Sequence, residues 1–138
     1  MSKNVIHAGG LFPNPMLNRE GSASVDFIPG TICIFEDGKV KPSADGNESA
    51  IKYVANMDYL RCKTVKDKFE TGDWVVCMHP MTGVFFNVPA IAGSYKKGEP
   101  LKIVNGQVTS GGDATSIFYV EESDTINTDG DLIRVLVK

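Results

Sequence analysis

Histidine and carboxylate side chains are the groups in this sequence that could carry acid–base or metal chemistry, and their spacing does not favour it. The chain has 138 residues and two histidines, His7 and His79, and neither has further ligands at the spacing of a metal site. Five serines lie in turns among glycine and threonine, and none sits in the pattern of a nucleophile elbow: Ser22, Ser24, Ser94, Ser110 and Ser116. We therefore predict no catalytic residue, no metal site and no cofactor; an enzyme would need His7 or His79 to meet carboxylates in one pocket.

Three cysteines are the remaining candidates for chemistry. Cys33, Cys62 and Cys77 lack the close paired spacing of zinc or redox sites. Cys33 and Cys77 lie inside apolar runs, which favours buried thiols, and we predict that all three cysteines are reduced. Free thiols are typical of a protein that folds in a reducing cytoplasm.

Charged residues are distributed unevenly along the chain. The formal net charge of −3 argues against nucleic acid as the main partner, because phosphate binding needs concentrated lysine and arginine. Six acidic residues and no basic residue lie between Lys102 and Arg134. Four basic residues crowd another stretch, opposed only by Asp67: Arg61, Lys63, Lys66 and Lys68. These stretches are either solvated loops or complementary patches between neighbouring subunits.

The elements that must position these groups are indicated by a short unit that recurs four times. Each unit has a turn glycine, a polar residue and then a run of strand-forming residues, and the glycines are Gly30, Gly72, Gly98 and Gly130. Glycine supplies the positive φ of tight turns, and β-branched residues suit a pleated, half-buried surface. The sequence therefore predicts a succession of β-hairpins.

We predict an all-β fold, a single-domain β-sandwich or barrel of short hairpin strands. Runs such as 74–78 are apolar at successive positions, which implies cover on both faces from a second layer or another subunit. A short helix over 47–57 is the alternative to a strand at 51–55. The expected strands are 25–27, 31–35, 39–41, 51–55, 59–65, 74–78, 84–88, 101–104, 107–109, 117–120 and 132–137.

Residues 1–24 differ from the rest and are predicted to form an extended N-terminal arm preceding a β-domain at 25–138. The segment 9–17 combines large apolar side chains with two prolines, which exclude it from a helix and from a central strand. Exposed together, these side chains would form an association-prone patch, so the arm lies on its own domain or on a neighbouring chain. The predicted contact residues are Leu11, Phe12, Pro13, Pro15, Met16 and Leu17.

The spaced units of glycine, acid and apolar run resemble a family, the small decoration or cement proteins that coat the heads of tailed bacteriophages. The residues that carry the resemblance are 70–76, 96–101 with 105–108, and 130–137. The resemblance covers about residues 25–138. It implies an all-β domain, often trimeric, that binds the outer surface of the major capsid lattice, and a proline-rich arm suits that role.

We therefore expect a non-enzymatic virion structural protein that binds the major capsid protein and stabilises the head. We expect a homo-oligomer, most readily a trimer, made in the host cytoplasm and located on the capsid surface, with neither nucleic acid nor membrane as a partner. No stretch approaches the length of a membrane span.

Two other functions remain open on the sequence. The chain could be another phage structural module of a tail or baseplate, or a carbohydrate-binding module. Exposed aromatic side chains beside a groove, such as Tyr53, Tyr59 and Tyr95, would favour sugar binding, whereas an apolar arm leaving the domain would favour a cement protein.

Overall fold

Strands make up nearly all of the regular structure in the computed structural model, which describes residues 3–10 and 18–138. The helical element among these residues is a single 3-10 turn, η1 (Tyr59–Arg61). The predicted all-β fold is therefore confirmed. In the described ranges, no helix has the length and apolar character needed to cross a membrane.

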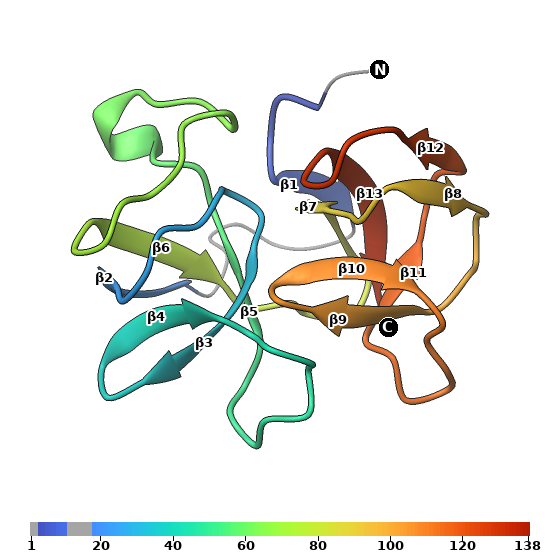
Figure 1. Cartoon of the computed structure of the whole chain (residues 1–138), viewed down its shortest axis with the longest axis horizontal. Helices are drawn as coiled ribbons and strands as arrows, with labels where there is room; N and C mark the ends of the chain where they lie inside the picture. Colours follow the sequence, from blue (N-terminus) through green and yellow to red (C-terminus); the bar gives the residue numbers. More distant parts are fainter. Residues whose placement is uncertain (1–2, 11–17) are drawn as a thin grey trace.

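One half of the molecule is a small closed barrel, on the left in Figure 1. Its strands follow one another around the barrel in the order β2-β4-β3-β5-β6, with β2 and β4 parallel and the other pairs antiparallel. The strands are β2 (Asn18–Ala23), β3 (Ile32–Glu36), β4 (Lys39–Pro42), β5 (Tyr53–Ala55) and β6 (Trp74–Met78).

The other half, on the right in Figure 1, is a four-stranded antiparallel sheet with two hairpin-like ribbons. The sheet has the order β1-β7-β13-β11, and the ribbons pair β9 with β10 and β8 with β12. The sheet strands are β1 (His7–Gly10), β7 (Val84–Pro89), β11 (Phe118–Val120) and β13 (Leu132–Val137). The ribbon strands are β8 (Gly93–Tyr95), β9 (Leu101–Val104), β10 (Gln107–Ser110) and β12 (Asp124–Ile126).

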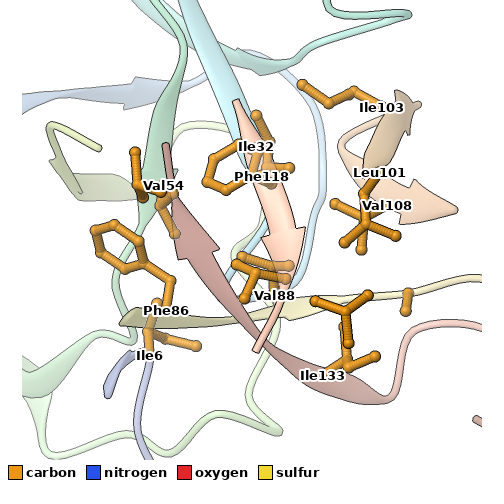
Figure 2. Close-up of a cluster of buried hydrophobic side chains, with 14 of the residues drawn as sticks. Ile6, Ile32, Val54, Phe86, Val88, Leu101, Ile103, Val108, Phe118 and Ile133 are labelled. Carbon is orange, nitrogen blue, oxygen red and sulfur yellow. The ribbon is translucent and has the colours of Figure 1, made fainter. Parts of the chain in front are cut away.

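Two hydrophobic cores lie side by side and share the barrel wall. The smaller core fills the barrel with residues such as Cys33, Ala55 and Cys77. The larger core contains Ile32 and Val54 from the barrel together with side chains of the other half. Figure 2 shows Ile32 and Val54 beside the rings of Phe118 and Phe86. The prediction that apolar runs are covered on both faces is confirmed, and within the described residues the second layer belongs to the same chain.

Backbone contacts at two glycines join the halves. The β9–β10 turn inserts at the start of β3, where Ile32 N–H donates to the Gly106 carbonyl and Gly106 N–H donates to the Ser43 carbonyl, at 2.9 and 2.7 Å. Gly106 has a φ of 77°, and a Cβ there would lie 2.4 Å from the Thr31 methyl group. A Cβ on Gly30, which has a φ of 87°, would lie 2.9 Å from the Asn87 carbonyl oxygen. Only glycine fits either contact.

The structure departs from the predicted strands in several places. The segment 59–65 contains η1 instead of a strand, because the carbonyl of Asp58 accepts the N–H groups of Arg61 and Lys63 and curls the chain. The segment 47–57 contains the short strand β5 and no helix, and 25–27 contributes only a bridge between Phe27 and Phe69. Four further strands, β1, β2, β8 and β12, were not predicted, because glycine and polar residues dominate them.

The segment expected to be an extended arm contributes to both halves where the structure describes it. β1 is an edge strand beside β7, and β2 is a wall of the barrel. Ile6 is fully buried in the larger core, and the Asn87 side chain donates to the Val5 carbonyl at 2.7 Å. Residues 3–10 are therefore part of the folded unit, and strand structure begins well before Val25.

Truncation of Ile6 tests this role. We expect Ile6→Ala to lower the free energy of unfolding by about 2–5 kcal/mol, because it leaves a cavity in a packed core. Its neighbour Val5 is 44% exposed, so Val5→Ala should change stability by no more than about 0.5 kcal/mol. Urea unfolding of the two variants measures both, and equal small effects would show that Ile6 contributes little to the core.

Candidate interaction surface

The predicted contact residues of the arm, Leu11, Phe12, Pro13, Pro15, Met16 and Leu17, lie outside the described residues. The chain on either side of them belongs to different halves, since β1 ends at Gly10 and β2 begins at Asn18. The arm contact therefore remains a prediction.

The two histidines lie in different parts of the molecule. The His7 ring packs on Phe86 with 6.1 Å between centroids, and the His79 ring meets Tyr53 edge-on at 5.7 Å. Both histidines thus have aromatic neighbours. Throughout residues 3–10 and 18–138, no group of three or more histidine, cysteine, aspartate or glutamate side chains is placed to hold a metal ion.

The tyrosines named as candidates for sugar stacking do not form an exposed cluster. Tyr53 and Tyr95 are buried, and the Tyr95 hydroxyl donates to the Ile91 carbonyl at 2.5 Å. Tyr59 alone of the three is exposed, at 45%. Since sugars stack on exposed ring faces, this arrangement removes the feature that would have favoured a carbohydrate site.

The cysteines divide into two buried thiols and one exposed thiol. Cys33 and Cys77 face the barrel core, and burial raises the pKa of Cys33 well above its usual value and the pKa of Cys77 to about 12. Cys62 lies at the end of η1 with a φ of 58°. The prediction of buried thiols is confirmed for Cys33 and Cys77.

Residues of the basic stretch form ion pairs with carboxylates of the same chain, and residues of the acidic stretch form ion pairs with its lysines. The Arg61 guanidinium lies 3.5 Å from the Asp58 carboxylate and 3.7 Å from that of Asp73, and the Lys68 ammonium lies 3.3 Å from Asp26. In the acidic stretch, the Glu121 carboxylate lies 3.5 Å from the Lys97 ammonium, and that of Glu122 lies 3.6 Å from the Lys3 ammonium. Lys66 lines a cavity of about 600 Å³ between the halves, to which Asp124, Asp129 and Asp131 also contribute. Much of the charge complementarity is therefore intramolecular.

Exposed apolar side chains gather beside η1. Tyr59, Leu60 and Trp74 are 45, 66 and 51% exposed, and with half-buried Met57 they surround a recess of about 140 Å³. Buried Phe69 and Val76 contribute to its lining. We call the side chains of Met57, Tyr59, Leu60 and Trp74 the η1 surface; η1 projects from the barrel at the upper left of Figure 1.

Local hydrogen bonds and ion pairs fix the η1 surface. Trp74 begins β6 and points away from the barrel core, and its indole Nε1 donates to Glu20 Oε1 at 2.9 Å. Asp58 anchors the turn through its backbone carbonyl, and its carboxylate with that of Asp73 brackets Arg61. A small apolar surface whose polar neighbours are already paired has the composition of a protein-binding hot spot.

Sequence reasoning missed this surface because it assigned 59–65 to a strand and treated Trp74 as one residue of a doubly covered run. In β6, Val75 and Cys77 face the barrel core, whereas Trp74 lies on the outer face. The sequence carries no clear signal for it, since the adjacent pair Tyr59-Leu60 also suits a strand, in which one of the two would face the core, whereas here both are exposed.

Comparisons with known proteins reveal a relationship of fold. No known protein family matches the sequence, and no curated protein is similar to it. The chain is similar to a solved crystal structure, the head fiber gp8.5 N base of bacteriophage phi29, with a TM-score of 0.62 and 16% sequence identity. The similarity covers 90% of this chain and 95% of the other. The two chains therefore share an all-β fold over nearly their whole lengths.

Alkylation of the native protein tests the positions of the thiols. We expect one cysteine, Cys62, to react rapidly with a maleimide reagent, and Cys33 and Cys77 to react only after unfolding, because the thiolate is the reactive form and the barrel buries both thiols. Peptide mass mapping identifies the modified residue. Rapid modification of Cys33 or Cys77 would contradict the barrel interior described above.

The raised pKa of Cys77 also predicts a loss of stability in alkali. The unfolded chain releases this thiol proton near pH 8.5, whereas the folded protein keeps it to about pH 12. Between these values stability should fall by about 1.4 kcal/mol per pH unit for this thiol. From pH 8.5 to 10.5, Cys77→Ala should therefore lose less stability than the unsubstituted protein, by about 2 kcal/mol in urea unfolding. Parallel losses would contradict the shift.

Proposed function

We propose that this chain is a non-enzymatic structural protein of a phage virion, which binds the outer surface of the head and stabilises it. The observation that carries the proposal is the fold shared over 90% of the chain with a head fiber base. The sequence resemblance to head decoration proteins supports the same location. The major capsid protein is the partner that this role requires.

The mechanism is mechanical, since each copy would bridge adjacent capsid proteins through modest contacts. Many such contacts add through avidity, so that no single interface needs to be large. The rigid all-β body, built on two joined cores, suits a protein that has to transmit strain across a lattice.

We also propose a homo-oligomer, most readily a trimer. The doubly apolar strand runs no longer support it, because their cover comes from the same chain. Its remaining support is the apolar segment 11–17.

A second candidate function is the base of a fibre on the head, rather than a cement protein. The similar structure is itself a head fiber base, and this chain covers 95% of it. A fibre base needs the same attachment to the head, so the two functions differ in whether loss of the protein weakens the particle.

Binding to heads of the phage that encodes the chain tests the proposal. Heads assembled without this protein should bind the purified protein saturably in co-sedimentation, and bound protein should raise the temperature at which they release DNA. Binding without stabilisation would favour the fibre base, and an absence of binding would exclude both candidates.

Serine substitutions test the predicted arm contact without removing Ile6 from the core. We expect the combined change of Leu11, Phe12, Met16 and Leu17 to serine to weaken head binding at least about tenfold, since each buried side chain contributes roughly 1.5–3 kcal/mol before ordering costs. The melting temperature should be unchanged. A matched control is Val25→Ser, on an exposed side chain in another segment. Equal binding by both variants would show that the arm makes no contact.

A further inference from the structure

We propose that the η1 surface is the contact through which this chain holds the capsid protein, and that it takes one apolar side chain flanked by lysine or arginine. This inference rests on the proposed function and adds to it a site and the chemistry of its partner.

The shape of the recess sets the size of the group that fills it. The recess has a volume of about 140 Å³, and buried Val76 and Phe69 line it together with the η1 surface and with Asp58 and Arg61, which pair with each other. A leucine, methionine or phenylalanine side chain has this size and polarity. The exposed side chains around it would bury further apolar area against the partner, which is where binding free energy arises.

The η1 surface is also organised before it binds. Glu20 fixes the indole of Trp74, and Asp58 and Asp73 hold Arg61, so these two side chains lose little entropy on docking. Among residues 3–10 and 18–138, the other exposed large apolar side chains are Val5, Val25 and Ile51, and they do not line this recess. They are single exposed residues of the kind that all soluble proteins carry.

The charges around the recess select a cationic partner. Three carboxylates lie beside the η1 surface: those of Asp58 and Asp73 flank the Arg61 guanidinium, and that of Glu20 accepts the indole N–H of Trp74. Of the lysines that follow in the sequence, Lys68 pairs with Asp26, and neither Lys63 nor Lys66 lines the recess. A second copy of this chain carries a net charge of −3, which makes it a poorer match than a basic surface.

Substitutions at the centre of the η1 surface test the contact. Trp74→Ala and Leu60→Ser should each weaken binding to heads about tenfold or more, as truncation of hot-spot residues does. Ile51→Ser, which alters an equally exposed apolar residue outside the recess, should bind within about twofold of the unsubstituted protein. Leu60 is 66% exposed, so Leu60→Ser keeps the test valid even if Trp74→Ala perturbs the fold.

Glu20→Gln isolates the electrostatic part, because glutamine keeps an acceptor for the indole and removes the charge. We expect weaker head binding at low salt and a smaller dependence of binding on salt than in the unsubstituted protein. Unchanged salt dependence would overturn the cationic partner.

Cys62 provides a footprint in the unsubstituted protein, since its exposed thiol directly follows η1. Its alkylation should slow when heads are added and stay constant when the protein alone is concentrated. Slowing with protein concentration alone, abolished by Trp74→Ala, would make a second copy the occupant and overturn the proposal. If the protein binds heads, but Cys62 alkylation does not slow and Trp74→Ala and Leu60→Ser bind as well as the unsubstituted protein, the contact proposed here is wrong and the proposed function stands. An absence of head binding would instead contradict the proposed function.

Discussion

The structure depends on the two-sided burial of three barrel strands. Along β3, β5 and β6, neighbouring residues point alternately into the barrel and into the second core: Cys33 and Ile32, Ala55 and Val54, Cys77 and Met78. A strand that contributes to two cores cannot slip by one residue without exchanging both sets of side chains. The register of the barrel and the position of the other half are therefore fixed by the same residues.

The close approach of backbones at the junction follows from this arrangement. The tip of the β9–β10 ribbon reaches the barrel through hydrogen bonds of Gly106, and a side chain there would displace Thr31. Asn87 lies at the other contact. Its backbone carbonyl packs so closely on Gly30 that a Cβ would not fit there, and its side-chain amide donates to the Val5 carbonyl. The N-terminal residues thus complete the junction, which explains why Ile6 is buried although its sequence context suggests a free arm.

The sequence contained the fold class, because turn glycines and β-branched runs are local signals. Gly30, Gly72, Gly98 and Gly130 all have positive φ, as the recurring unit predicts. The strands that could not be predicted from the sequence are those that depend on pairing with distant residues. β2 reads as polar, NREGSA, and is a strand because β4 and β6 flank it in the barrel. The candidate site was missed for a related reason, since η1 is set by hydrogen bonds to Asp58 rather than by residue propensity.

Because the apolar runs are covered within the chain, the apolar side chains that remain exposed need a separate explanation. If β6 needed a neighbouring subunit to cover it, Trp74 would be one of several apolar side chains of that strand left uncovered in the monomer. Instead Val75, Cys77 and Met78 are satisfied within the chain, and Trp74 is held outward by Glu20. An indole held in this way, which lines the same recess as the exposed Leu60, does not contribute to the packing of either core. Its arrangement is therefore better explained by a surface that meets another protein than by the demands of folding.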